Sequence, residues 1–143
     1  MLLMSVKPIY AKLIFEGRKK YEFRKKIPTL QYNSRVIVYA SSRVRAIVGE
    51  FRVGNVYYMN IPDLWKLAKE KEGGVTKKQF FEYFRGYSHG YAIEILAPFK
   101  YPKELTLDEI RKVIPGFNPP VNFMRIKGKL KKVINDFLLD IDA

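Results

Sequence analysis

The chain has 143 residues, 48% of them hydrophobic, which is enough for one compact domain with a real core. It has no cysteine, which excludes disulfide frameworks, thiol catalysis and cysteine-ligated zinc. The formal net charge of +13 favours polyanionic partners, among which nucleic acid is the commonest.

This charge is concentrated in the first part of the chain. Residues 1–52 hold twelve basic and three acidic residues, a net charge of +9, whereas residues 53–143 hold fifteen and eleven, a net charge of +4. A lysine-rich surface that only aids solubility is the simpler interpretation. Because the basic residues alternate with tyrosine and phenylalanine, we favour an anion-binding face.

The first half of the chain predicts one helix and three strands. Apolar spacing and Pro8 predict a helix over 8–16, with Ser5 as its N-cap and Gly17 at its end. Three extended segments follow, over 20–25, 35–40 and 44–56. Gly49 and Gly54 interrupt the last of these, and we expect the strand to bend there.

The second half predicts alternating helices and strands, separated by glycine, proline or capping residues. In chain order they are a helix over 61–71, a helix over 77–84, a strand over 87–99 that ends at Pro98, a helix over 106–113, an irregular segment over 117–126 and a helix over 127–140. Thr76 and Thr106 are the expected N-caps. The aromatic stripe Phe80, Phe81 and Phe84 is expected to pack in the core.

These elements predict an α+β fold. Strand 35–40 is followed too closely by the next strand for a parallel crossover, so the two should form an antiparallel hairpin. We expect a small, mixed and mainly antiparallel β-barrel of about five strands with peripheral helices. Residues 1–143 should form a single domain, with helix 127–140 packed on it or extending it.

Residues 17–26 read G-R-K-K-Y-E-F-R-K-K and are the most informative stretch. In an extended backbone, Glu22 and Arg24 lie on one face, whereas Tyr21 and Phe23 point to the other. The aromatic face should therefore enter the core and the charged face should form a cleft. The alternative is that Arg24 pairs with Glu22 only to fix the strand.

Common catalytic signatures are absent from the sequence. There is no P-loop, dinucleotide fingerprint or nucleophile elbow. His89 is the only histidine, which excludes multi-histidine metal sites and makes a strand-edge role its simplest interpretation. We expect no metal and no cofactor. We also expect no membrane partner, since no run reaches the roughly 18 apolar residues of a membrane span. The expected location is the cytoplasm.

Gly17, Lys19, Glu22 and Arg24 spell G-x-K-x-x-E-x-R after a short helix, and this pattern resembles the ASCH family of the PUA-like superfamily. Further stretches are similar to that family: V-Y-A-S-S at 38–42, I-V-G-E-F at 47–51, G-Y-A-I-E-I at 90–95, and P-P-V-N-F at 119–123 with Arg125. The resemblance implies a PUA-like β-barrel with a cleft beneath the first helix, which binds RNA or modified nucleotides.

The predicted ligand-binding residues follow from this motif and its neighbours. They are Lys7, Tyr10, Lys19, Glu22, Arg24, Ser41 and Ser42. Lys19 and Arg24 can hold phosphates or base edges, and Glu22 can accept a hydrogen bond from a base amino group. Tyr10, Tyr21 and Tyr39 are candidates for stacking, although strand periodicity directs Tyr21 away from the cleft. The leading hypothesis is an RNA- or nucleotide-binding module, regulatory and without chemistry of its own.

Two other functions remain open. Some small ASCH proteins resembling this one are amidohydrolases acting on acetylated cytidine, and others are proposed ribonucleases. An enzyme of this kind would use Lys19 as its base and Glu22 as a second catalytic group, although the amidohydrolases have threonine at the Glu22 position. Glu50 or Glu70 would then supply a further acid. The ten tyrosines and ten phenylalanines also allow a protein-interaction adaptor.

Overall fold

The computed structural model describes residues 1–70 and 73–142, which form six strands and five helices. The strands are β1 Leu2–Val6, β2 Tyr21–Arg24, β3 Arg35–Ala40, β4 Ala46–Asn60, β5 His89–Thr106 and β6 Phe123–Arg125. The helices are α1 Pro8–Phe15, α2 Ile61–Glu70, α3 Lys77–Tyr83, α4 Leu107–Val113 and α5 Gly128–Asp142. In the helix predicted over 61–71, the last residue, Lys71, lies outside the described residues.

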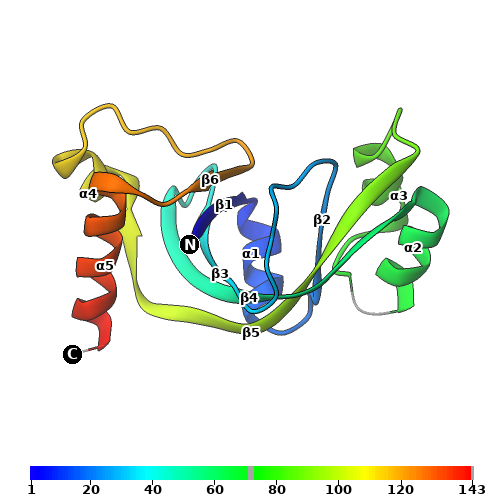
Figure 1. Ribbon diagram of the computed structural model, residues 1–143, viewed down its shortest axis with the longest axis horizontal. Coiled ribbons are helices and arrows are strands. Elements are labelled where there is room, and N and C mark those ends of the chain that lie inside the picture. Colours follow the sequence, from blue (N-terminus) through cyan, green and yellow to red (C-terminus); the bar gives the residue numbers. More distant parts are fainter. Residues whose placement is uncertain (71–72, 143) are drawn as a thin grey trace.

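All six strands join one sheet in the order β2-β5-β4-β3-β1-β6. β1 pairs with β3 in parallel, and every other pair is antiparallel, including the predicted β3–β4 hairpin. β4 and β5 curve along the length of the molecule, so the sheet forms half a barrel (Figure 1). The mixed, mainly antiparallel α+β prediction is confirmed, with six strands in place of about five and a curled half-barrel in place of a closed one.

The bend of the sheet arises where β4 and β5 change register. The pairing shifts between Ile47 and Gly49 and again between Val53 and Val56. Such bulges bend a strand and increase its twist. The bends expected at the two glycines of this strand are therefore confirmed.

β1 was not expected, and it corrects the role predicted for Ser5. Ser5 lies opposite Tyr39 in the sheet, so it does not cap α1; Lys7 holds that position without a side-chain cap. Pro8 begins the helix because the first turn has no use for its missing N–H. Leu3 and Met4 are both fully buried, so β1 lacks the polar alternation that identifies a strand with one wet face.

Three other strands differ from the predictions, and the first is β4, which was predicted over 44–56 and runs to Asn60. β5 continues past Pro98 to Thr106, because Pro98 falls in a register shift where no ladder hydrogen bond is required, next to Ala97 with a φ of 48°. β6 lies inside the segment predicted as irregular over 117–126. It is three residues long, too short for its pattern to show, and it pairs Arg125 with Leu2.

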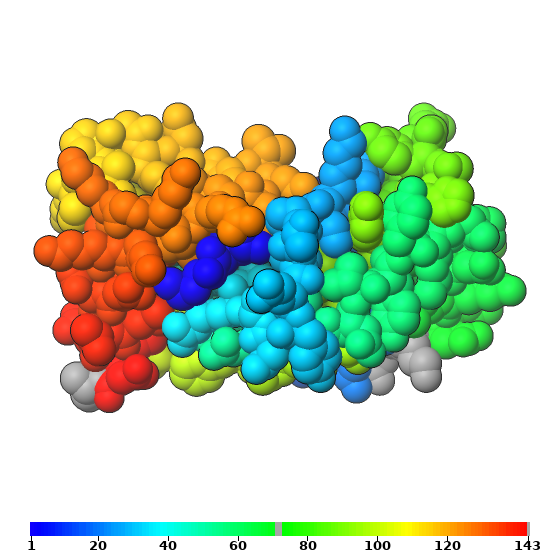
Figure 2. Space-filling view, in the orientation of Figure 1, coloured from blue at the N-terminus to red at the C-terminus, as the bar shows by residue number. Residues whose placement is uncertain are grey.

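The helices cover different parts of the curved sheet. α1 packs on the centre of the sheet, α2 and α3 lie at one end, and α4 and α5 at the other (Figure 1). Figure 2 shows the resulting elongated shape, with red α5 and green α2 at opposite ends. No helix among residues 1–70 and 73–142 is long and apolar enough to cross a membrane.

The core at the α2–α3 end confirms the predicted orientation of β2. Tyr21 and Phe23 are buried there, and the Phe23 ring meets Phe80 edge to face, with 5.4 Å between centroids. Phe84 is also buried, whereas Phe81 is 38% exposed. Thr76 and Thr106 cap α3 and α4 through reciprocal capping boxes, as predicted for both threonines. With its aromatic residues in this core, β2 turns Glu22 and Arg24 toward the opposite side.

Candidate functional site

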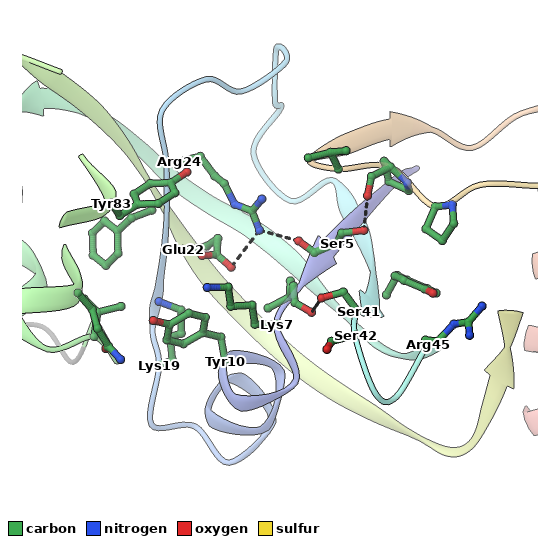
Figure 3. Close-up of a pocket in the computed structure, with 18 of the residues that line it drawn as sticks. Ser5, Lys7, Tyr10, Lys19, Glu22, Arg24, Ser41, Ser42, Arg45 and Tyr83 are labelled. Carbon is green, nitrogen blue, oxygen red and sulfur yellow. Dashed lines mark hydrogen bonds and ion pairs between the residues drawn. The ribbon is translucent and has the colours of Figure 1, made fainter. Parts of the chain in front are cut away.

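A cavity of about 920 Å³ opens between α1, β2 and the segment before β6. Its other walls come from α3 and α4. The turn after β3 completes them with Ser41, Ser42 and Arg45 (Figure 3). Among the described residues, the charged side chains that line it are Lys7, Lys19, Glu22, Arg24, Arg45, Glu82 and Arg111. Five cations and two carboxylates make the cavity suited to an anionic ligand.

All the predicted binding residues line this cavity. They are Lys7, Tyr10, Lys19, Glu22, Arg24, Ser41 and Ser42. The parallel pairing of β1 with β3 places Val6 opposite Ala40, so the start of α1 and the two serines lie at the same edge of the sheet. β2 supplies the opposite wall (Figure 3). The structure brings these side chains together, and their role in binding remains a prediction.

Lys19 lies beneath the end of α1 and is 1% exposed. After the helix, Gly17 adopts a φ of 73°, which turns the chain so that the Lys19 N–H donates to Leu13 O over 3.1 Å. The Lys19 ammonium donates to Gly73 O over 2.7 Å. A local turn and one distant carbonyl therefore fix both ends of this residue.

Two aromatic rings flank the Lys19 ammonium. Its Nζ lies 5.1 Å from the ring centroid of Tyr10 and 5.1 Å from that of Phe23. Burial lowers the pKa of Lys19 because the charged form loses its water; Glu22 opposes this shift and Arg24 adds to it, both less strongly. A buried amine with a lowered pKa in a cavity is a recognised mark of a functional site.

Glu22 is 5% exposed, lines the cavity and has one unsatisfied acceptor. Its Oε2 atom is buried and has no hydrogen-bond partner among the described residues. Arg24 Nη2 lies 3.6 Å from this oxygen, which is an ion pair but too long for a good hydrogen bond. A buried acceptor without a donor costs about 1–3 kcal/mol, so a ligand donor here would remove a penalty.

Arg24 holds the walls of the cavity together. Its Nη1 donates to Asn122 Oδ1 over 2.7 Å and its Nη2 to Ser5 O over 2.8 Å. The guanidinium also lies 5.6 Å from the Phe123 ring centroid. Both terminal nitrogens of Arg24, which the sequence suggested for phosphates or base edges, therefore donate to acceptors of the protein itself. Arg24 positions β1 and the segment before β6.

The remaining predicted residues lie around the rim. Lys7 and Ser42 are exposed, and Ser41 Oγ donates to Val6 O over 3.3 Å. Tyr10 is half-buried; its pKa is raised first by burial and second by the nearby Glu22 charge. The Tyr10 hydroxyl therefore stays protonated at neutral pH and can donate a hydrogen bond.

Sequence reasoning missed several residues of this cavity. Arg45, Glu82, Tyr83 and Arg111 come from the turn after β3, from α3 and from α4. Arg45 follows the two predicted serines in one turn, which was a usable signal. The other three lie on predicted helices whose packing the sequence does not reveal. Of the other two tyrosines suggested for stacking, Tyr21 lies outside the cavity, and Tyr39 lines it but is only 3% exposed, so its ring belongs to the core.

The acids proposed for an amidohydrolase lie elsewhere. Glu50 accepts a 2.9 Å hydrogen bond from the Tyr101 hydroxyl and pairs with Arg35 at 2.9 Å. Neither Glu50 nor Glu70 lines the cavity, so the suggestion that one of them assists Lys19 is wrong.

His89 lies in a separate groove. Within the described chain, no group of three or more histidine, aspartate or glutamate residues is placed to hold a metal ion.

Comparisons with known proteins identify the type of domain. The ASCH domain model matches residues 4–107. A Zymomonas mobilis protein named ASCH domain-containing ribonuclease is 26% identical over 118 residues, which cover 82% of this chain and 78% of that protein.

Solved structures show the same fold. The crystal structure of ASCH from Zymomonas mobilis superposes with a TM-score of 0.86 at 22% identity, covering 94% of this chain and 93% of that one. The N-terminal domain of Staphylothermus marinus McrB superposes with a TM-score of 0.57 at 13% identity, covering 94% and 92%. At these identities the superpositions establish the fold alone.

Proposed function

The chain belongs to the ASCH domain family, and we propose that it binds RNA or a nucleotide in the cavity beneath α1. The observation that carries this proposal is the unsatisfied Glu22 carboxylate inside a cavity lined by five cations. An anionic ligand that also carries hydrogen-bond donors fits both features. A nucleotide has such a composition, since its phosphate is anionic and its base edge bears donors.

The cavity offers separate contacts to the two halves of a nucleotide. Lys7 is an exposed cation at the rim, and Arg45 lies in the turn after β3, so both can reach phosphate oxygens. Glu22 can accept a hydrogen bond from the amino group of adenine, cytosine or guanine, which uracil lacks. Tyr10 borders the same space and is half-buried, so part of its ring is available to a base.

Titration of a labelled eight-nucleotide RNA, followed by fluorescence anisotropy, tests this proposal. The sugars carry 2′-O-methyl groups so that the RNA cannot be cleaved through its 2′-hydroxyls. We expect the logarithm of affinity to fall linearly with the logarithm of salt concentration, and Arg45→Ala to reduce the slope by about 0.7, the value for one phosphate contact on a single strand. Lys132→Ala, an exposed lysine on α5, is the matched control.

Base preference tests the Glu22 contact separately. Wild type should prefer octamers of adenine or cytosine over uracil, and Glu22→Gln should reduce that preference about tenfold, since a hydrogen bond to a charged group contributes about 1.5–3 kcal/mol. The proposal fails if neither an octamer nor a nucleoside monophosphate binds at low salt, or if Arg45→Ala and Glu22→Gln both behave as Lys132→Ala.

RNA cleavage is a second candidate, and two observations favour it. A relative is named a ribonuclease, and Lys19 is a buried amine whose pKa is lowered by burial. The neutral Lys19 amine would take the proton of a 2′-hydroxyl as the 2′-oxygen bonds to phosphorus. The bond from phosphorus to the 5′-oxygen would break, and the Tyr10 hydroxyl would return a proton to that oxygen.

The products of unmodified RNA test the cleavage reaction. The reaction predicts fragments ending in 2′,3′-cyclic phosphate, and Lys19→Met and Tyr10→Phe should each abolish or strongly reduce them. RNA that stays intact would rule out this candidate and leave the binding proposal standing. The amidohydrolase alternative has weaker support, because Glu22 replaces the family threonine and neither Glu50 nor Glu70 lines the cavity.

A further inference from the structure

A second groove of about 450 Å³ lies beside the cavity, between the segment after β2 and the start of β5. Among the described residues it is lined by Lys25, Lys26, Ile27, Tyr58, Tyr87, Ser88, His89 and Tyr91. Four of these are aromatic or imidazole rings, two are lysines, and none is acidic. In Figure 2, the blue segment after β2 adjoins the green region that contains α3 and the start of β5.

Three of these side chains, Tyr58, His89 and Tyr91, form what we call the aromatic platform. The Tyr58 ring stacks on His89 with 5.2 Å between centroids and an interplanar angle of 18°. It also meets Tyr91 at 4.7 Å. Tyr58 is nevertheless 62% exposed, so much of this large ring is open to solvent while its neighbours hold it in place.

The aromatic platform continues the sheet face that borders the cavity. Tyr91 of β5 pairs with Arg24 of β2 on one side and with Tyr58 of β4 on the other. Directly opposed residues of an antiparallel pair project to the same face. Arg24, Tyr91 and Tyr58 therefore form one row across three strands, and the row leads from the cavity wall to the groove.

Lys25 connects the two sites from the side of α3. Its Nζ lies 4.7 Å from the ring centroid of Tyr83 and 5.1 Å from that of Tyr87. Tyr83 lines the cavity, whereas Tyr87 and Lys25 line the groove. The backbone N–H of Lys25 also donates to the Tyr83 hydroxyl over 3.3 Å. A positive charge therefore lies between the two sites, with the exposed Lys26 beside it.

We infer that the groove holds a second part of the same ligand, which is single-stranded RNA of several nucleotides. This inference rests on the proposed RNA binding in the cavity and extends it. The RNA strand passes from the cavity over Lys25 and Lys26, which contact its phosphates, and one of its bases stacks on Tyr58. Exposed rings interleaved with lysines are the usual means of holding single strands, because every base has a face to stack.

The experiment compares ligands of different length on the same protein. Binding of the labelled 2′-O-methyl octamer is measured by anisotropy, and binding of the four nucleoside 5′-monophosphates by calorimetry. The octamer should bind at least tenfold more tightly than any monophosphate. Tyr58→Ala should weaken octamer binding about tenfold, which is typical for the loss of one stacked base, and should leave monophosphate binding unchanged.

Matched variants separate stacking from changes in the fold. Tyr58→Phe keeps the ring and should retain octamer affinity. Tyr32→Ala removes a tyrosine that is 69% exposed and lines neither site, and it should have no effect. Lys26→Ala should reduce the salt slope of octamer binding by about 0.7, whereas Lys132→Ala should not change it.

The outcomes also separate this inference from the cavity proposal. Two results would exclude the groove and leave the cavity proposal standing, provided that monophosphates bind. The first is an octamer that binds no more tightly than a monophosphate. The second is an octamer affinity for Tyr58→Ala equal to that for Tyr32→Ala. If Tyr58→Ala weakens the octamer while Arg45→Ala and Glu22→Gln do not, the groove binds RNA and the cavity proposal fails. A wild-type protein that binds neither the octamer nor any monophosphate overturns both.

Discussion

The Lys19 ammonium donates a 2.7 Å hydrogen bond to the Gly73 carbonyl, so this cavity residue is bonded to the segment before α3. The next residue, Gly74, approaches the same lysine closely. It has a φ of 72°, and a Cβ atom placed there would lie 2.7 Å from Lys19 Cβ. The position of Lys19 in the cavity thus requires a glycine at residue 74.

Gly74→Ala should lower the free energy of unfolding by more than the left-handed backbone alone explains. The backbone cost is about 1–2 kcal/mol, and the contact with Lys19 adds an overpacking cost of about 1–3 kcal/mol. Gly116→Ala is the matched control, since Gly116 has a φ of 80° and nothing within 4 Å of an added Cβ. Urea denaturation of both variants gives the comparison. Equal losses would contradict the close packing against Lys19.

Burial of Lys19 should make stability depend on pH. Its pKa is lowered in the folded protein, whereas in the unfolded chain it is about 10.4. Between these two values the unfolded state binds more protons, so the free energy of unfolding rises with pH. Burying the charged form of Lys19 destabilises the fold fully at pH values below the pKa of the folded state. At pH values above the pKa of the unfolded state this destabilisation is absent.

Lys19→Met removes this titration while keeping an unbranched side chain of similar length. Urea denaturation at a series of pH values from 7 to 10 should show stability rising with pH in the wild type and a smaller rise in the variant. Comparison with Lys132→Met, on the exposed face of α5, accounts for the general effect of losing a charge. Parallel profiles for wild type and Lys19→Met would show that Lys19 titrates normally.

Arg24 and Glu22 should be coupled in stability. Arg24→Gln removes charged donors from Ser5 O and Asn122 Oδ1 and leaves the Glu22 carboxylate buried without its cation. We expect a loss of about 3–5 kcal/mol, because breaking one partner of a buried pair leaves an uncompensated charge. Glu22→Gln added to Arg24→Gln should recover about 1–2 kcal/mol of this loss, as measured by a double-mutant cycle. Additive effects would mean that the 3.6 Å pair contributes nothing.

The Tyr101–Glu50 contact should affect stability and leave ligand binding unchanged. The pKa of Tyr101 is raised by burial first and by the Glu50 charge second, so the hydroxyl remains a donor at neutral pH. Tyr101→Phe removes the donor to Glu50 Oε1 and should cost about 1–3 kcal/mol. Octamer affinity should match wild type, because neither residue lines the cavity or the groove. A change in affinity would indicate that Glu50 takes part in binding.

Much of the site could be predicted because its signals are local. Residues 20–24 alternate between charged and aromatic side chains, and a strand directs successive side chains to opposite faces, so Phe23 entered the core and Glu22 the cavity. The ends of the helices were equally readable, since Pro8 and the threonine caps act on the nearest backbone groups. The spacing around Lys19 also identified the family.

What only the tertiary structure decided depends on pairings between distant residues. The parallel pairing of β1 with β3 brings Arg45 and the serines to the start of α1, and β1 has no alternation that would have revealed it. The row of Arg24, Tyr91 and Tyr58 exists only because β2, β5 and β4 are neighbours. The burial of Lys19 likewise required the Gly73 carbonyl, 54 residues away. Sequence periodicity fixes which face a side chain takes, whereas strand order fixes what that face meets.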